Sequence, residues 1–255
     1  MNTITFLGTG TSTGVPQIRC SCPTCSSNDP HDKRLRASAL INYKDKNILI
    51  DCGPDFRTQM LSVGSPDLNA VLLTHSHYDH VGGLDDLRPY CADSLFPIYC
   101  RQDVSDDLHA RLPYCFNVGL KPGVPHYDIH VIDPSRSFDI DDIQVTPLPV
   151  MHAKLPILGY RIGSLAYITD CKTMPESTID LIKNIDTLVI NALRPTPHFS
   201  HLSLSQALDL IKIINPRRAF LTHMSHGTPP HAIARTLLPD NVSFAHDMLS
   251  ITFPD

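Results

Sequence analysis

Residues 74–80 have the sequence THSHYDH, which places His75, His77, Asp79 and His80 within seven positions. Burying this many polar side chains without partners costs free energy, so the stretch requires either solvent or a ligand. Residues 69–73 (NAVLL) precede it and form a short, mainly apolar run that predicts a buried strand. The cluster therefore lies at the end of a strand, where a rigid scaffold can hold functional groups on a loop.

The spacing within this stretch indicates metal binding. His75 and His77 are separated by one residue, so on extended backbone their side chains point the same way and can bind one ion. Asp79 and His80 are adjacent, and in a turn they can point toward a second ion. Each ion requires further ligands from elsewhere in the chain. Three other predicted strands also end in metal-competent residues: His152, Asp170 and His223.

A second cluster of possible ligands consists of Cys20, Cys22 and Cys25. Thiolates suit zinc, but three of them leave a tetrahedral site one ligand short. A disulfide would leave one cysteine unpaired, and an iron–sulfur cluster would lack a matched fourth cysteine. The glycine-rich loop at 8–14 could instead suggest a dinucleotide site, but Val15-Pro16 follows it where that site needs a helix.

The composition of the 255 residues excludes several classes of protein. The hydrophobic fraction of 42% is enough for a sizeable core, and the net charge of −5 comes without a run of like charges, so neither a nucleic-acid tail nor a membrane patch is expected. No apolar stretch approaches the roughly 20 residues of a membrane span. The N-terminus lacks a signal-peptide pattern, so we expect a cytoplasmic protein with eight reduced cysteines.

The order of predicted elements indicates an α/β fold. Strands are expected over residues 4–7, 38–43, 47–51, 70–73, 127–132, 143–148, 157–162, 166–169, 187–191, 218–222 and 248–252. Helices are expected over about 55–63, 102–112, 175–184, 203–214 and 230–237, with another beginning within 81–87 and a proline-rich loop near 113–126. Strands in both halves with helices between them suit two packed sheets with helices outside. No repeat or linker divides the chain, so residues 1–255 are expected to form a single domain.

Several stretches resemble a known family. The pattern H-x-H-x-D-H at residues 75–80 resembles the signature of the metallo-β-lactamase-fold superfamily. Together with C-x-C-x-x-C at 20–25 and T-H-x-x-H at 222–226, it is similar to the PhnP-like phosphodiesterases of that superfamily. The likeness covers nearly the whole chain: LGTGTSTGVP, CSCPTC, NILIDCG, LLTHSHYDHVGGL, PLPVMHAKLPILGY, YITDC, FSHLSL and FLTHMSH. The resemblance implies an αββα sandwich of the metallo-β-lactamase type.

The resemblance also implies roles for individual residues. One metal would be bound by His75, His77 and His152, the other by Asp79, His80 and His223, and Asp170 would bridge both. Manganese or zinc would occupy this pair. His226 would be the fourth ligand of a structural zinc at the cysteine cluster, and His201 would be a catalytic histidine. Asp51 matches a position near the metals, where it is expected to orient a ligand rather than bind metal. The remaining histidines match no motif and are interpreted as structural or surface residues: His31, His109, His126, His130, His198, His231 and His246.

The function implied by the resemblance is hydrolysis of a small cyclic phosphate, such as a phosphoribosyl cyclic phosphate or a 2′,3′-cyclic nucleotide. The metals would activate water, Asp170 would hold the geometry, and His201 would protonate the leaving oxygen or hold a phosphate oxygen. A homodimer is also implied. No membrane and no long nucleic acid is expected as a partner.

Three other functions fit parts of the pattern. A thioester or lactone hydrolase would use the same ligands, because the same metal pair can act on carbonyls. A transfer-RNA 3′-processing nuclease would need a basic arm, whereas the basic residues within 100–126 are scattered among acidic ones. A metal-binding accessory protein resembling the pyrroloquinoline quinone biosynthesis B protein would share the cysteine cluster, but the complete ligand set argues against an inactive role.

Overall fold

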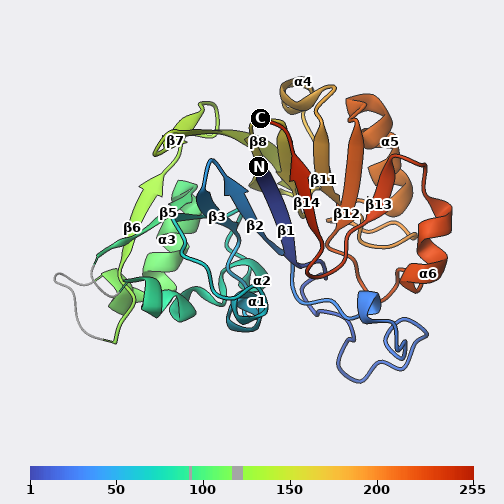
Figure 1. Ribbon diagram of the computed structural model, residues 1–255, viewed down its shortest axis with the longest axis horizontal. Helices are drawn as coiled ribbons and strands as arrows, with labels where there is room; N and C mark the ends of the chain where they lie inside the picture. Colours follow the sequence, from blue (N-terminus) through green and yellow to red (C-terminus); the bar gives the residue numbers. More distant parts are fainter. Residues whose placement is uncertain (92–93, 117–122) are drawn as a thin grey trace.

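Two facing β-sheets form the centre of the computed structural model, which describes residues 1–91, 94–116 and 123–255 (Figure 1). Within these residues each sheet has seven strands. The first sheet has the order β14 (Ser250–Phe253), β1 (Asn2–Gly8), β2 (Ser38–Tyr43), β3 (Lys46–Ile50), β4 (Ala70–Leu72), β5 (Phe96–Cys100) and β6 (Tyr127–Val131). The second has the order β13 (Val242–Phe244), β12 (Arg218–Thr222), β11 (Thr187–Asn191), β10 (Leu165–Ile168), β9 (Leu155–Ile162), β8 (Ile143–His152) and β7 (Phe138–Ile140).

Both sheets are mixed. Strands β3 to β6 are parallel to one another in the first sheet, and strands β10 to β13 are parallel in the second. The other pairs are antiparallel. The carboxyl ends of parallel strands lie on the same side of a sheet. On that side, the residues that follow β3 and β4 in the first sheet lie close to those that follow β10 and β12 in the second, and we call this side of the two sheets their shared edge.

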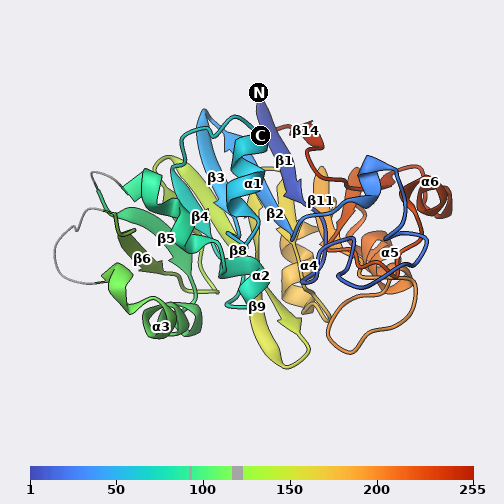
Figure 2. The same ribbon diagram turned by 90° about the horizontal axis from the view of Figure 1, so that it is seen from below.

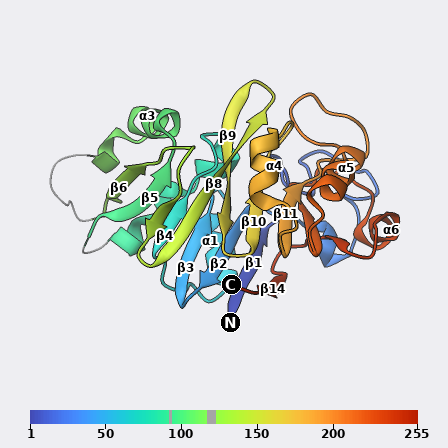
Figure 3. The same ribbon diagram turned by 90° about the horizontal axis from the view of Figure 1, so that it is seen from above.

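Helices cover the outer face of each sheet. Figure 2 shows α1 (Phe56–Ser62), α2 (Tyr78–Val81) and α3 (Gln102–Arg111) beside the first sheet, and Figure 3 shows α4 (Glu176–Ile182) and α5 (Leu204–Ile214) beside the second. The remaining helix α6 (His231–Ala234) and four 3-10 helices are short: η1 (Pro30–Asp32), η2 (Leu84–Cys91), η3 (Pro113–Phe116) and η4 (Arg235–Leu237). In the part of the chain that the structure describes, no helix combines the length and apolar character needed to cross a bilayer.

Three apolar cores separate these layers and confirm the predicted αββα sandwich. One lies between the sheets and is formed by side chains from both, such as Ile48 and Leu158. The second packs the second sheet against α4 and α5, and the third packs the first sheet against α1, η2 and α3. The hydrophobic effect therefore acts on both faces of each sheet, which explains why many strands are apolar runs rather than alternating patterns.

Some predicted elements differ from the observed ones. Strands β5, β7 and β13 were not expected: β5 contains Pro97, which argues against a strand, and β7 and β13 have only three residues each. The helix expected to begin within 81–87 starts earlier as α2 and continues as η2, and the helix expected over 230–237 consists of α6 and η4. Residues 117–122 of the expected 113–126 loop lie outside the described residues.

The two chain ends lie side by side on the first sheet. Strand β1 pairs antiparallel with β14, with Asn2 opposite Phe253. The side-chain amide of Asn2 also donates a hydrogen bond to Asp255 at 2.6 Å. Figure 3 shows both ends together, at the end of β1 opposite to Gly8.

Candidate active site

Two aspartates and one histidine have an unusual backbone conformation just after the strand that each of them follows. Asp51, Asp170 and His223 come directly after β3, β10 and β12 or one residue later, and each has positive φ, at 60°, 57° and 56°. Residues other than glycine rarely adopt this left-handed conformation, which costs free energy and is concentrated at functional sites. The turn ends each strand and directs these three side chains to the edge shared by the two sheets.

Four side chains at this edge form one compact group of possible metal ligands. One ligand atom from each of Asp79, His80, Asp170 and His223 lies within 4.8 Å of all the others. His223 Nε2 is 3.0 Å from Asp170 Oδ1, and His80 Nε2 is 3.2 Å from Asp79 Oδ2. Both imidazole nitrogens are buried without a hydrogen-bond partner. Buried polar atoms normally have a partner, so this geometry fits a cation placed among them.

A second group uses the other oxygen of the same aspartate. Ligand atoms of His75, His77 and Asp170 lie within 4.8 Å of one another, with His75 Nε2 3.8 Å from Asp170 Oδ2. His152, predicted to complete this set, lies beside it, with its ring 5.2 Å from that of His77. Its Nδ1 donates to the carbonyl oxygens of Asp170 and Ser200, both at 2.9 Å, which leaves Nε2 available. Within the 4.8 Å limit, however, His152 groups with Asp170 and His201 rather than with His75 and His77.

The electrostatics of the site favour bound positive charge. Burial alone would raise the pKa of Asp170, but His223 and His80 hold it well below its usual range, so the carboxylate is ionised. Burial also opposes charge on His80, yet Asp170, Asp79 and Asp51 together raise the pKa of His80 well above its usual value. Imidazole nitrogens and carboxylate oxygens are suitable ligands for zinc or manganese. The residues therefore fit a pair of divalent metals.

Asp51 lies behind His80 and contacts it directly. Its Oδ2 accepts a hydrogen bond from His80 Nδ1 at 2.6 Å, and its Oδ1 accepts one from the Thr74 amide at 2.8 Å. The Asp51 side chain is fully buried. A carboxylate in this position holds the proton on Nδ1 and leaves Nε2, which faces Asp79 and Asp170, free to bind a metal.

The ring of His201 lies 4.6 Å from that of His152 and 4.9 Å from that of His223, and one of its nitrogens has no hydrogen-bond partner. Its Nδ1 is 3.9 Å from Asp170 Oδ2 and is buried without a hydrogen-bond partner. Burial, assisted by the nearby imidazole of His223, lowers the pKa of His201 to about 3, so the ring is neutral around pH 7 before substrate binds. A neutral imidazole can donate a hydrogen bond to phosphate, and an anionic phosphate beside it would raise its pKa.

His198, for which no sequence pattern indicated a place at the site, lies beside His201. Its ring lies 5.2 Å from that of His201 and 4.6 Å from that of the exposed Phe199. A histidine in an irregular loop has no periodic signal, and its position three residues before His201 was the only available clue. By contrast, the rings of His31, His231 and His246 contact one another and belong to none of the metal-ligand groups among the described residues.

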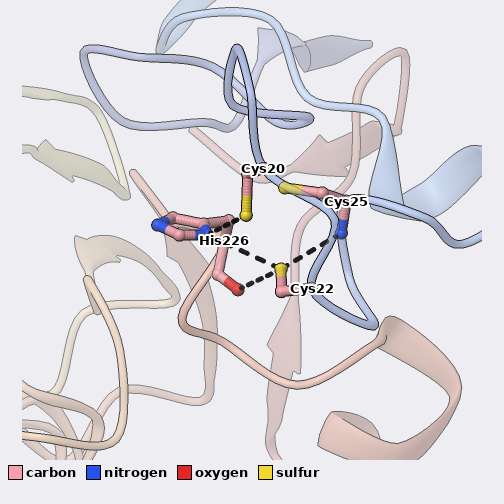
Figure 4. Close-up of side chains that lie close together, drawn as sticks. All are labelled: Cys20, Cys22, Cys25 and His226. Atoms are coloured by element: carbon pink, nitrogen blue, oxygen red, sulfur yellow. Dashed lines mark hydrogen bonds between the residues drawn. The ribbon is translucent and has the colours of Figure 1, made fainter.

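The cysteine cluster forms a separate group with His226 (Figure 4). The Nδ1 of His226 is 3.1 Å from Cys20 Sγ and 3.6 Å from Cys22 Sγ. The backbone amide of Cys25 donates to Cys22 Sγ at 3.4 Å and lowers the pKa of that thiol to about 6, whereas burial raises the pKa of Cys25 to about 11. Three sulfurs and one imidazole suit a tetrahedral zinc ion. The structure thus brings the three cysteines together with a histidine that lies at least 201 positions further along the chain.

Comparison with known proteins identifies the class. The family model of the β-lactamase superfamily domain matches residues 46–224. The chain therefore belongs to the β-lactamase superfamily, and its buried His/Asp site is typical of the dinuclear metal centre of that fold. Its two-sheet architecture is the metallo-β-lactamase fold.

A solved structure shows to which family within the superfamily the chain belongs. A protein described as a new diphosphatase from the PhnP family is 35% identical, with a TM-score of 0.92, and the match covers 100% of this chain and 98% of that one. Within the superfamily, the chain belongs to the PhnP family, as its sequence motifs predicted.

Two curated relatives are longer than this chain. An octanoyltransferase of Porphyromonas gingivalis is 45% identical over 246 residues, which is 96% of this chain and 50% of that protein. A coenzyme PQQ synthesis protein B of Klebsiella pneumoniae (strain 342) is 27% identical over 178 residues, 62% of this chain and 55% of that protein. This chain thus spans about half the length of these relatives, and their names describe proteins of which only part is matched.

Proposed function

We propose that residues 1–255 act as one dinuclear metal phosphodiesterase domain that hydrolyses a small phosphate ester, with a cyclic phosphate as the preferred substrate. The observation that carries this proposal is the position of Asp170. Its two carboxylate oxygens face different groups of imidazoles, Oδ1 toward His80 and His223 and Oδ2 toward His75 and His201. A carboxylate placed in this way is suited to join two metal sites.

Each side chain would have a separate role. His75, His77 and His152 would hold one metal, Asp79, His80 and His223 the other, and Asp170 would bridge them. When bound, the two metals lower the pKa of water and withdraw charge from phosphoryl oxygens. Either manganese or zinc suits this ligand set, and a zinc ion would fill the cysteine cluster as a structural metal.

His201 would act on the substrate itself. Its neutral ring would first donate a hydrogen bond to a phosphate oxygen. The negative charge of the bound phosphate would then favour the protonated ring, which could give its proton to the departing alkoxide. Burial of His201 supports this role, because exclusion of water strengthens such interactions.

Two related proteins suggest neighbouring activities. The solved PhnP-family relative is described as a diphosphatase, which supports a phosphorus-centred reaction and makes a diphosphate a second phosphate substrate to test. The 45% identical relative is named an octanoyltransferase, and this single observation favours an acyl thioester hydrolase as the second candidate function. The homodimer expected from the resemblance stays a prediction.

A substrate screen would decide between these candidates. The metal-loaded protein would be assayed for kcat/KM with a 2′,3′-cyclic nucleotide, a phosphoribosyl cyclic phosphate, a nucleoside diphosphate ester, an octanoyl thioester, a lactone and a precursor transfer RNA, with a chelator-treated sample as control. We expect the highest value for a cyclic phosphate and loss of activity in the chelated sample. A higher value for the diphosphate would change the substrate but keep the reaction class, whereas a higher value for the thioester or lactone would overturn the proposal.

A further inference from the structure

The loop that carries His201 has no regular secondary structure, and backbone hydrogen bonds join its two ends. It spans residues 194–203, between β11 and α5. The amide of Leu193 donates to the Leu202 carbonyl at 3.0 Å, and the amide of Leu204 donates to the Arg194 carbonyl at 2.9 Å. Loops of this kind depend on internal contacts for their conformation, so the position of His201 depends on what holds the loop from inside.

The side chain of Lys172 supplies two of these contacts and extends them to the start of α5. Its Nζ donates to the carbonyl oxygens of His198 at 2.7 Å and His201 at 3.3 Å, and to Oε1 of Gln206 at 3.0 Å. An ammonium group has three donor hydrogens, and each has one acceptor here. Gln206 Oε1 also accepts from the Ser203 amide, so the contact extends into the capping box at the start of α5.

The backbone of Lys172 is fixed on the opposite side, beside the predicted metal ligands. Its amide donates to the carbonyl of Met151 at 2.7 Å, the residue before His152, and Lys172 itself follows Asp170 by two positions. One residue therefore connects the strand ends that carry His152 and Asp170 to the loop that carries His201. Lysine side chains usually extend into water, whereas the ammonium of Lys172 makes two contacts to this loop and a third to the first turn of α5.

We propose that Lys172 is a positioning residue that sets the imidazole of His201 against the substrate phosphate. The inference rests on the proposed function, because His201 must act on a bound phosphate for its position to affect the rate. Lys172 belongs to none of the groups of possible metal ligands among the described residues, and its effect on the reaction would come through His201. A shift of about 1 Å in a catalytic group can cost about 10²-fold in rate.

Kinetics of single and double variants test this role. Lys172→Met should lower kcat/KM for a 2′,3′-cyclic nucleotide by about 10- to 100-fold, with unchanged metal content. In a His201→Ala background the same substitution should cause no further loss of kcat/KM, because Lys172 would then have no imidazole to position. Lys154→Met is the matched control: Lys154 is exposed and lies two residues after His152, and its replacement removes the same charge without altering a contact to the loop. A silent Lys172→Met variant, an equal loss in Lys154→Met, or a full additional loss in the His201→Ala background would overturn the proposal.

A second measurement does not depend on activity. Hydrogen exchange of the amides in 194–203 should become faster in Lys172→Met, with melting temperature and exchange elsewhere unchanged. Unchanged exchange in this loop would overturn the role of Lys172. If the wild-type protein hydrolyses no phosphate ester, the proposed function fails, and this measurement alone decides whether Lys172 orders the loop. Lys172→Gln, which keeps one polar head group, replaces Lys172→Met under the same criteria if the latter does not fold.

Discussion

Asp51→Asn should weaken metal binding at the two predicted sites that share Asp170, although it removes none of their predicted ligands. The new asparagine side chain would have only one oxygen, and the Thr74 amide, fixed in the backbone, requires it as an acceptor at the present distance of 2.8 Å. The amide nitrogen of that side chain would then face His80 Nδ1, which now donates to Asp51 at 2.6 Å. Two donors cannot pair, so the proton of His80 would move to Nε2.

The size of the effect follows from where that proton goes. His80 Nε2 lies 3.2 Å from Asp79 Oδ2 and 3.5 Å from Asp170 Oδ1, and a protonated nitrogen cannot bind a metal there. Restoring the productive tautomer would leave two N–H groups facing each other in a fully buried position. Loss of such an orienting partner costs about 10- to 100-fold in metal affinity, or about 1.4 to 2.7 kcal/mol.

The assay is a competition titration of metal-free protein with zinc and a chelating indicator. The cysteine cluster serves as an internal reference, because Asp51 contacts none of its donors. Asp32→Asn is the matched control: Asp32 is also buried, but its Oδ1 accepts from the backbone amide of His231 rather than from a metal-facing imidazole. Wild-type affinity in a folded Asp51→Asn variant, or an equal loss in Asp32→Asn, would refute the tautomer argument.

Four further predictions concern Asp170, His201, the cysteine cluster and Asp247. Asp170→Ala should abolish turnover and reduce the metal bound at the pair, as measured by metal analysis, while full activity with unchanged metal would contradict the bridging role. His201→Ala should slow a 2′,3′-cyclic nucleotide by about 10²-fold or more but a nitrophenyl diester much less, because a good leaving group needs no proton; equal losses in kcat/KM would exclude the acid role. Cys22→Ser should remove one zinc per chain and lower the melting temperature, since structural zinc binding is coupled to folding, and wild-type cysteines that all react with a thiol reagent in the presence of zinc would argue against the closed site. Burial raises the pKa of Asp247 from its usual value of 3.8 to about 6. The folded state therefore holds this proton to higher pH than the unfolded chain, so the contribution of Asp247 to stability should fall by roughly 3 kcal/mol between about pH 4 and 6. Urea unfolding of the metal-free wild type relative to Asp247→Asn should show this fall, and a constant difference between the two proteins across that range would contradict it.

The fold and the metal-binding edge could be predicted from the sequence because both depend on short local signals. An apolar run followed by a histidine or aspartate marks a strand end, and this pattern alone located His75, His152, Asp170 and His223. The contact of Cys20 with His226 could be expected only from the family resemblance, since no local pattern connects residues 206 positions apart.

Other features could not be predicted because they depend on the three-dimensional arrangement. Strand β5 contains Pro97, and the three-residue strands β7 and β13 are too short to show a period. A lysine such as Lys172 has the same appearance in sequence whether its ammonium faces water or three acceptors. The orientation of His152, which donates through Nδ1 to two carbonyls, likewise depends on residues 18 and 48 positions away.

The pairing of β1 with β14 places the two ends of the chain next to each other. A short peptide could therefore join Asn2 to Phe253, and the chain could be cut at another exposed turn, such as Lys44–Asp45. The product would be a circularly permuted protein with the same sheets. The ends also lie about 20 Å from the metal-binding edge, the length of a seven-residue strand. A second protein module attached at either end would therefore extend from the end of β1 that lies away from the predicted metal ligands, which is compatible with a relative twice as long as this chain.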